Sequence, residues 1–143
     1  MSQRVFVDAN VINDIFDEKR RFHTASYQCL QYCLEHGLSL LTTCDIVTAV
    51  YYITAKSKDR ANALGALGRV NNIFEIIPFG NQQLADAIAL MHEDGDYDDL
   101  EDTVQYVLAQ QAGCDVILTN DAGFVAKDLP VLSSVDFIEN PRR

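Results

Sequence analysis

Aspartates stand beside apolar segments at three places in this chain. Asp8 and Asp121 each follow a short apolar run, and Asp102 lies near the start of a strongly apolar helical segment. Carboxylates that gather in one place repel one another, so such a cluster is costly unless cations neutralise it. Oxygen ligands of high charge suit Mg²⁺ or Mn²⁺, and these ions orient water, help to ionise it and stabilise charge on a scissile phosphate. The pattern predicts a magnesium or manganese site, provided that the fold brings these residues together.

Short apolar runs alternate with segments whose apolar residues recur at helical spacing. The expected strands cover residues 5–8, 38–42, 74–78 and 116–119, with a short last strand over 135–138. The expected helices cover residues 11–16, 23–36, 45–56, 60–70, 81–92 and 100–112. This alternation predicts an α/β fold with a short, mostly parallel central sheet covered by helices on both faces. Ligands of such sheets bind beyond the carboxyl ends of the strands, where Asp8 and Asp121 are expected.

Composition limits the function classes that need to be considered. The formal net charge of −10 argues against a nucleic-acid binder that works through a broad basic surface. No linker or composition shift divides the chain, so we expect a single domain over residues 1–143. The four cysteines lack zinc-ligand spacing, which favours free thiols in a reducing cytoplasm. No apolar run approaches the ~18 residues of a membrane span, so no membrane contact is expected.

A strongly acidic stretch precedes the helix expected at residues 100–112. Helix N-termini favour acidic residues, so Asp99 as a cap and Asp102 in the first turn need no functional explanation by themselves. The stretch also resembles the opening of a calcium-binding loop. Such a loop requires a glycine where this chain has Asp99 and a glutamate where it has Gln105, so it is rejected. The stretch contains more acidic residues than helix capping explains, and this still indicates a bound cation.

Two motifs resemble those of the PIN domain family, the fold of VapC-type toxin ribonucleases. VFVDANVINDIF looks like the family's first motif, and DLEDTVQYVLAQQAGCDVILTNDAGF looks like its second half. The central YYITAK and the closing SSVDFIENP are similar to one PIN subfamily. The resemblance covers nearly the whole chain and implies a single PIN-like domain. It also implies a metal-dependent endoribonuclease that hydrolyses single-stranded RNA phosphodiesters.

The resemblance assigns site roles to particular residues. It implies that Asp8, Asp102 and Asp121 are metal-binding catalytic acids, with Mg²⁺ or Mn²⁺ as the cofactor. Asp99 is expected to be a further ligand or a group that orients one. Two more side chains are expected to support the site, Asn10 and Thr119.

One position departs from the family pattern. PIN nucleases usually carry a glutamate on the helix after the second strand, and this chain has Ala49 there. Asp45 lies one helical turn earlier on the same face and is a candidate substitute with a shorter reach. The competing interpretation is that Asp45 only caps this helix. Both interpretations stay open, and activity is in doubt if the second one holds.

The resemblance also implies partners: RNA as substrate, a small antitoxin protein, and a second copy of the chain. An apolar surface around Val50, Tyr51, Ile53 and residues 61–67 is the expected dimer contact. The first alternative function is a catalytically weak or inactive PIN domain that acts as a binding or scaffold module. The second is a phosphatase of the haloacid dehalogenase type, which requires a second aspartate where this chain has Asn10.

Overall fold

Five parallel strands form one sheet within residues 3–139, the part of the chain that the computed structural model describes. The strands are β1 (Arg4–Val7), β2 (Ser39–Thr43), β3 (Phe74–Ile77), β4 (Val116–Leu118) and β5 (Val131–Leu132). Their order across the sheet is β3-β2-β1-β4-β5, and every pairing is parallel. The carboxyl ends of all the strands therefore meet at one edge, the edge at which β1 and β4 lead into Asp8 and Thr119.

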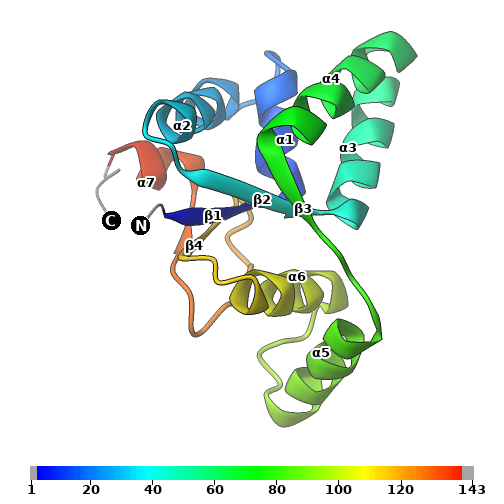
Figure 1. Ribbon diagram of the computed structural model, residues 1–143, viewed down its shortest axis with the longest axis vertical. Coiled ribbons are helices and arrows are strands. Elements are labelled where there is room, and N and C mark those ends of the chain that lie inside the picture. Colours follow the sequence, from blue (N-terminus) through cyan, green and yellow to red (C-terminus); the bar gives the residue numbers. More distant parts are fainter. Residues whose placement is uncertain (1–2, 140–143) are drawn as a thin grey trace.

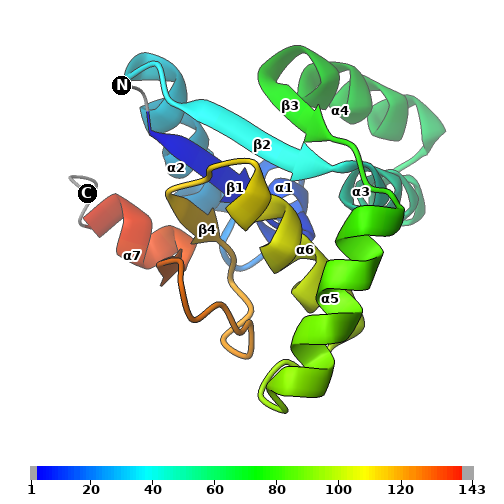
Figure 2. The same cartoon turned by 60° about the horizontal axis from the view of Figure 1, so that its bottom comes forward.

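Helices cover both faces of the sheet. They are α1 (Ala9–Phe16), α2 (His23–Glu35), α3 (Cys44–Ser57), α4 (Arg60–Ile73), α5 (Asn81–Glu93), α6 (Leu100–Gln111) and α7 (Ser134–Glu139). In Figure 1, α1 to α4 lie above the sheet and α5 and α6 lie below it. Figure 2 shows α6 against the strands with α5 packed beside it, and α7 packs against α2. The expected fold class, a parallel α/β sheet with helices on both faces, is confirmed.

Burial explains why these segments take these forms. Residues 5–7 and 116–118 are almost completely buried, as expected for central strands covered on both faces. Helix α6 is buried throughout residues 103–109, because it lies between the sheet and α5. Gly37 and Gly113 follow α2 and α6 with φ of 66° and 73°, a conformation that glycine adopts without strain when it ends a helix. No helix of the described residues is both long and apolar enough to cross a membrane.

The prediction of a last strand over residues 135–138 is wrong. Residues Ser134–Glu139 form the short helix α7, and the last strand is β5, a few residues earlier. Ser134 and Phe137 are fully buried while Val135 is exposed, which is the spacing of one helix face rather than the alternation of a strand. The single domain over residues 1–143 stays a prediction, since residues 1–2 and 140–143 lie outside the described part.

Candidate functional site

Asp8 stands where β1 gives way to α1. It is the N-cap of α1, and its Oδ1 accepts a hydrogen bond of 2.7 Å from the backbone N–H of Ala9. Its Oδ2 accepts hydrogen bonds from Thr119 Oγ1 at 2.9 Å and from Asn10 Nδ2 at 3.3 Å. Asp8 is only 6% exposed, and this burial raises the pKa of its carboxyl group although the hydrogen bonds from Thr119 and Ala9 lower it. Asp8 is thus a buried, oriented carboxylate.

The predicted supporting residues, Asn10 and Thr119, both contact Asp8. Asn10 Oδ1 accepts a hydrogen bond of 2.8 Å from the backbone N–H of Asn120, which turns its Nδ2 toward Thr119 Oγ1 at 3.0 Å and toward Asp8. Thr119 Oγ1 also accepts a hydrogen bond of 3.1 Å from the backbone N–H of Asp121. The two side chains therefore connect the end of β1 to the end of β4.

A second buried network lies behind this one, and sequence reasoning assigned no role to its residues. Asp14 is 3% exposed in α1 and accepts hydrogen bonds from Arg20 Nε at 2.8 Å and Ser26 Oγ at 3.0 Å. Its Oδ2 also accepts a hydrogen bond of 2.8 Å from Asn120 Nδ2, and Asn120 Oδ1 accepts one of 2.9 Å from the backbone N–H of Ser134. The sequence did offer one indication of this network: Asp14 lies inside the apolar segment 11–16, and a carboxylate that is buried there needs hydrogen-bond partners.

Asp99 and Asp102 come from the start of α6. Asp99 is the N-cap, and its Oδ1 accepts a hydrogen bond of 2.9 Å from the backbone N–H of Asp102. The pKa of Asp102 is raised to about 7, first by burial and then by the carboxylates of Asp99, Asp8, Asp121 and Glu101. The fold therefore places the three predicted catalytic acids within electrostatic reach of one another.

Asp121 and Asp45 both lie close enough to Asp8 for their charges to act on it. Asp121 is exposed, and its Oδ1 accepts a hydrogen bond of 2.9 Å from the backbone N–H of Gly123. Asp45 is exposed in the first turn of α3, and its carboxylate accepts a hydrogen bond from the hydroxyl of Thr43. The charges of Asp121 and Asp45 both add to the raised pKa of Asp8. The N-cap of α3 is Thr43, so the interpretation in which Asp45 caps this helix is wrong.

Glu101 belongs to the same group of acids and was missed by sequence reasoning. Its pKa is raised by burial and then by the carboxylates of Asp45, Asp8 and Asp99. The feature of the sequence that could have indicated Glu101 is its position next to Asp102 in the first turn of α6. Neighbouring residues on a helix point about 100° apart, however, so this position did not show whether Glu101 faces the site or faces solvent like the acidic residues before it.

The donor set fits a hard divalent cation. All the candidate ligands are carboxylates, which Mg²⁺ and Mn²⁺ prefer. Among the described residues, no lysine or arginine forms an ion pair with Asp8, Asp102 or Asp121, so none of these residues supplies a counter-ion for their charges. Within residues 3–139, no three Asp, Glu, His or Cys side chains are gathered closely enough to hold an ion as they stand. Like charges keep apart, so binding requires these side chains to rotate toward a common ion.

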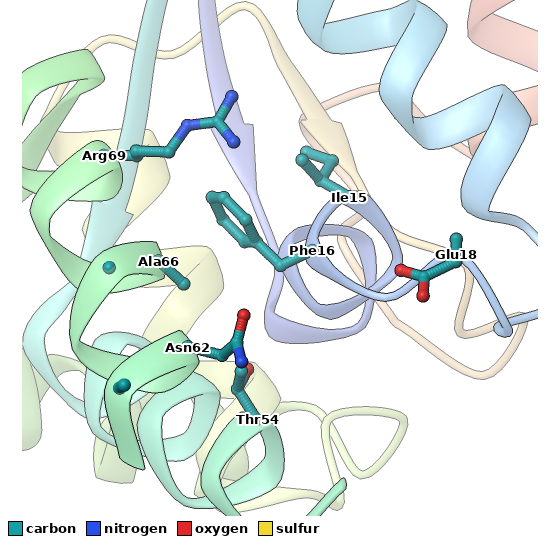
Figure 3. Close-up of a pocket in the computed structure, with 9 residues that line it drawn as sticks. Ile15, Phe16, Glu18, Thr54, Asn62, Ala66 and Arg69 are labelled. Atoms are coloured by element: carbon teal, nitrogen blue, oxygen red, sulfur yellow. The ribbon is translucent and has the colours of Figure 1, made fainter. Parts of the chain in front are cut away.

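A cavity of about 520 Å³ lies away from these carboxylates, between α1 and the α3–α4 pair. Figure 3 shows Phe16 reaching into it from the end of α1, with Thr54 and Asn62 on the side of α3 and α4. The guanidinium carbon of Arg69 lies 5.3 Å from the centroid of the Phe16 ring. The lining includes Glu18 but none of the predicted site aspartates, so this cavity is separate from the candidate metal site.

Known proteins resemble this chain in sequence and in fold. The sequence model of the PIN domain family matches residues 5–129. Ribonuclease VapC1 of Aquifex aeolicus (strain VF5) is 48% identical over 138 residues, which cover 96% of this chain and 95% of that protein. A chain of VapBC2 from Rickettsia felis, solved bound to a DNA fragment from its promoter, superposes with a TM-score of 0.71 at 14% identity, over 92% of this chain and 98% of that one. The sarcin-ricin-loop-cleaving toxin VapC20 of Mycobacterium tuberculosis superposes with a TM-score of 0.66 at 13% identity, over 85% of this chain and 96% of that one. With both motifs inside the matched region and the acids at the carboxyl edge of the sheet, this chain belongs to the PIN domain family.

Proposed function

We propose that this protein is a divalent-metal-dependent endoribonuclease that hydrolyses single-stranded RNA phosphodiesters. The observation that carries the proposal is the placement of Asp8, Asp102 and Asp121 around one edge of the sheet, where no lysine or arginine of residues 3–139 forms an ion pair with them. Support comes from the relative at 48% identity, which is named a ribonuclease. The net charge of −10 is unfavourable for binding RNA directly, and a divalent ion between carboxylates and phosphates compensates for it.

In this proposal, some residues of the chain bind the metal ion and others orient those ligands. Asp8, Asp102 and Asp121 would hold Mg²⁺ or Mn²⁺, with Asp99 as a further ligand or an orienting group. A bound ion of this kind lowers the pKa of water and stabilises charge on the phosphate. Thr119 and Asn10 keep the Asp8 carboxylate in a fixed orientation through the hydrogen bonds described above, which preserves its direction toward the site.

Water is the attacking group in this proposal. Within the described residues, no serine hydroxyl or cysteine thiol is hydrogen-bonded to a histidine, so no pair for covalent catalysis is present. Attack by water on the phosphorus, with the 3′-oxygen as the leaving group, leaves a 5′-phosphate and a 3′-hydroxyl. A reaction that used the RNA's own 2′-hydroxyl would instead leave a 2′,3′-cyclic phosphate, so the products distinguish the two routes.

The level of activity depends on Asp45, because Ala49 offers no carboxylate on α3. Asp45 contributes negative charge toward Asp8 and Glu101, which supports its role as the substitute. A PIN domain that binds a partner or RNA without cleaving is the second candidate function. It is favoured by Ala49 and by the net charge of −10.

We also propose that the protein is the toxin of a toxin–antitoxin pair, acts in the cytoplasm and forms a homodimer. Similar folds solved as VapBC complexes, such as those from Rickettsia felis and Salmonella typhimurium, support an antitoxin partner. The proposed dimer surface needs correction, since Val50, Ala63 and Ala66 are buried and cannot contribute to it. The exposed apolar side chains there are Tyr52 at 67%, Ile53 at 43% and Leu64 at 45%. The cysteines are all free, which agrees with a reducing compartment.

A nuclease assay with Mn²⁺ tests the proposal. Wild-type protein should cleave single-stranded RNA at low ionic strength, and EDTA should abolish cleavage. Asp8→Asn should also abolish it, because an amide supplies no charge to hold the ion. Asp98→Asn is the matched control, because Asp98 is exposed and accepts no hydrogen bond among the described residues, and it should cleave like the wild type. Cleavage that survives EDTA, or products with a 2′,3′-cyclic phosphate, would contradict the mechanism. Metal binding without cleavage of any RNA would favour the non-catalytic candidate.

A further inference from the structure

Two segments without regular secondary structure carry acids to the candidate metal site. Residues 119–130, between β4 and β5, contain Asp121, and residues 94–99, between α5 and α6, end in the N-cap Asp99. The segments lie side by side, because Gly123 lines the same small hollow as Asp99. Acids on the two segments repel one another when no cation is bound, so keeping the segments together requires attractive contacts elsewhere.

Lys127 supplies such contacts. Its Nζ donates hydrogen bonds to Asp94 Oδ2 at 2.7 Å and to Asp96 Oδ2 at 2.8 Å. Its backbone N–H donates a hydrogen bond of 2.8 Å to the hydroxyl of Tyr97. Tyr97 is only 4% exposed, and its ring stacks on that of Tyr106 with 5.3 Å between the centroids, which fixes the position of this hydroxyl. The side chain and the backbone of Lys127 are thus both held by the segment that leads into α6.

The choice of partners matters as much as the contacts. Among the lysines and arginines of residues 3–139, Lys127 is the one that forms ion pairs within the acidic stretch 93–102, which contains seven acids. Its partners, Asp94 and Asp96, are not candidate metal ligands. A lysine paired with a candidate ligand would compete with the ion for the carboxylate. Lys127 therefore offsets repulsion beside the site without occupying the site.

We propose that Lys127 is a positioning residue for the divalent ion. Through the contacts described above, it keeps residues 119–130 against the start of α6, so that acids from both segments can reach one ion. This inference rests on the proposed metal-dependent function. Lys127 touches neither the ion nor the RNA and acts only through the two segments that it joins. With these segments already in place, only side chains need to rotate when the ion binds, which favours tight binding.

Isothermal titration of Mn²⁺ into metal-free protein tests this role through the sign of the effect. Lys127→Met takes a positive charge away from a group of acids, so an effect of charge alone would strengthen Mn²⁺ binding. Loss of positioning should instead weaken binding, by roughly tenfold. Tyr97→Phe removes the hydroxyl acceptor without changing any charge and should also weaken binding. Lys127→Arg keeps the charge and the donors and should bind Mn²⁺ like the wild type.

Lys58→Met is the matched control for the loss of a lysine. It breaks an ion pair of 2.8 Å with Glu18 at the end of α3, and it removes the same charge as Lys127→Met. Because Lys58 joins neither of the two acid-bearing segments, this variant should bind Mn²⁺ no more weakly than the wild type.

Hydrogen exchange of the metal-free proteins measures the positioning directly. In Lys127→Met, the backbone amides of residues 121–128 should exchange faster than in the wild type, while those of β4 keep their protection. Unchanged exchange in this loop, protection lost in β4 as well, or Mn²⁺ affinity equal to or above that of the wild type overturns the role of Lys127. The proposed function survives that result if Asp102→Asn still loses Mn²⁺ binding. Wild-type protein that binds no Mn²⁺ overturns both.

Discussion

Replacing Asp102 with asparagine should make the metal-free protein more stable at alkaline pH. The pKa of Asp102 is about 7 in the folded protein against an ordinary value of 3.8, a shift of about 3 pKa units. Such a shift corresponds to about 4 kcal/mol at full strength, and solvent around the half-buried side chain reduces it to about 1 to 2 kcal/mol. The lost attraction between this carboxylate and the N-terminus of α6 costs about 0.5 kcal/mol. The net gain is about 1 kcal/mol, or ~4 °C in melting temperature.

The pH dependence has a definite sign. The raised pKa means that folded Asp102 holds its proton more tightly than the unfolded chain does, so wild-type stability falls as pH rises from 3.8 toward 7. The loss of stability caused by Asp102 is complete once the pH lies well above 7, because the carboxyl group is then fully ionised in the folded protein. Asparagine does not titrate, so the difference between variant and wild type should be small at pH 4.5 and largest at pH 8.

Melting curves of metal-free protein at both pH values measure this difference. Adding Mn²⁺ at pH 8 should reverse the order, because an ion at 100 times its dissociation constant stabilises the wild type by about 2.7 kcal/mol. Asp98→Asn is the matched control and should follow the wild type in every condition. The reasoning fails if Asp102→Asn melts below the wild type in EDTA at pH 8, or if both proteins gain equally from Mn²⁺.

Three further substitutions have expected outcomes. Asp45→Ala should weaken Mn²⁺ binding in calorimetry while leaving urea unfolding almost unchanged, because Asp45 is not the N-cap of α3; a loss of stability with intact binding would contradict this. Ala49→Glu adds a carboxylate one turn further along α3 and should raise both Mn²⁺ affinity and RNA cleavage, and no gain in either would show that the position is not limiting. Asp14→Ala leaves Arg20 and Asn120 without their buried acceptor and should cost about 3 kcal/mol in urea unfolding, whereas a loss below about 1 kcal/mol would show that the network relaxes easily.

The strand-end residues were predictable because parallel strands impose a simple geometry. A short apolar run that ends in a polar residue places that residue at the carboxyl edge, and two such runs paired in one sheet bring their ends together. Asp8 and Thr119 follow this rule, and the structure joins them by a hydrogen bond of 2.9 Å. Asp99 as a helix cap was equally readable from local chemistry, and it is the N-cap of α6.

The remaining site residues depend on tertiary contacts that no local pattern encodes. Glu101 and Asp102 are neighbours in an acidic stretch, and only the packing of α6 against the sheet decides which of them approach Asp8. Asp14 was recognisable as unusual, but its partners Asn120 and Ser26 come from distant parts of the chain. The segment 135–138 was too short for periodicity to distinguish a strand from a helix.

Through Asn120, the orientation of the side chains around Asp8 depends on α7. Its backbone N–H donates to Asn10, its Nδ2 donates to Asp14, and its Oδ1 accepts from the backbone N–H of Ser134 at the start of α7. The PIN domain match ends at residue 129, before Ser134. A recombinant fragment cut at that boundary would keep every predicted site aspartate and still lose the hydrogen bond between Asn120 and Ser134. Expression fragments, and fusions attached to the C-terminus, therefore need to retain α7 if the measured metal affinity is to be that of the native site.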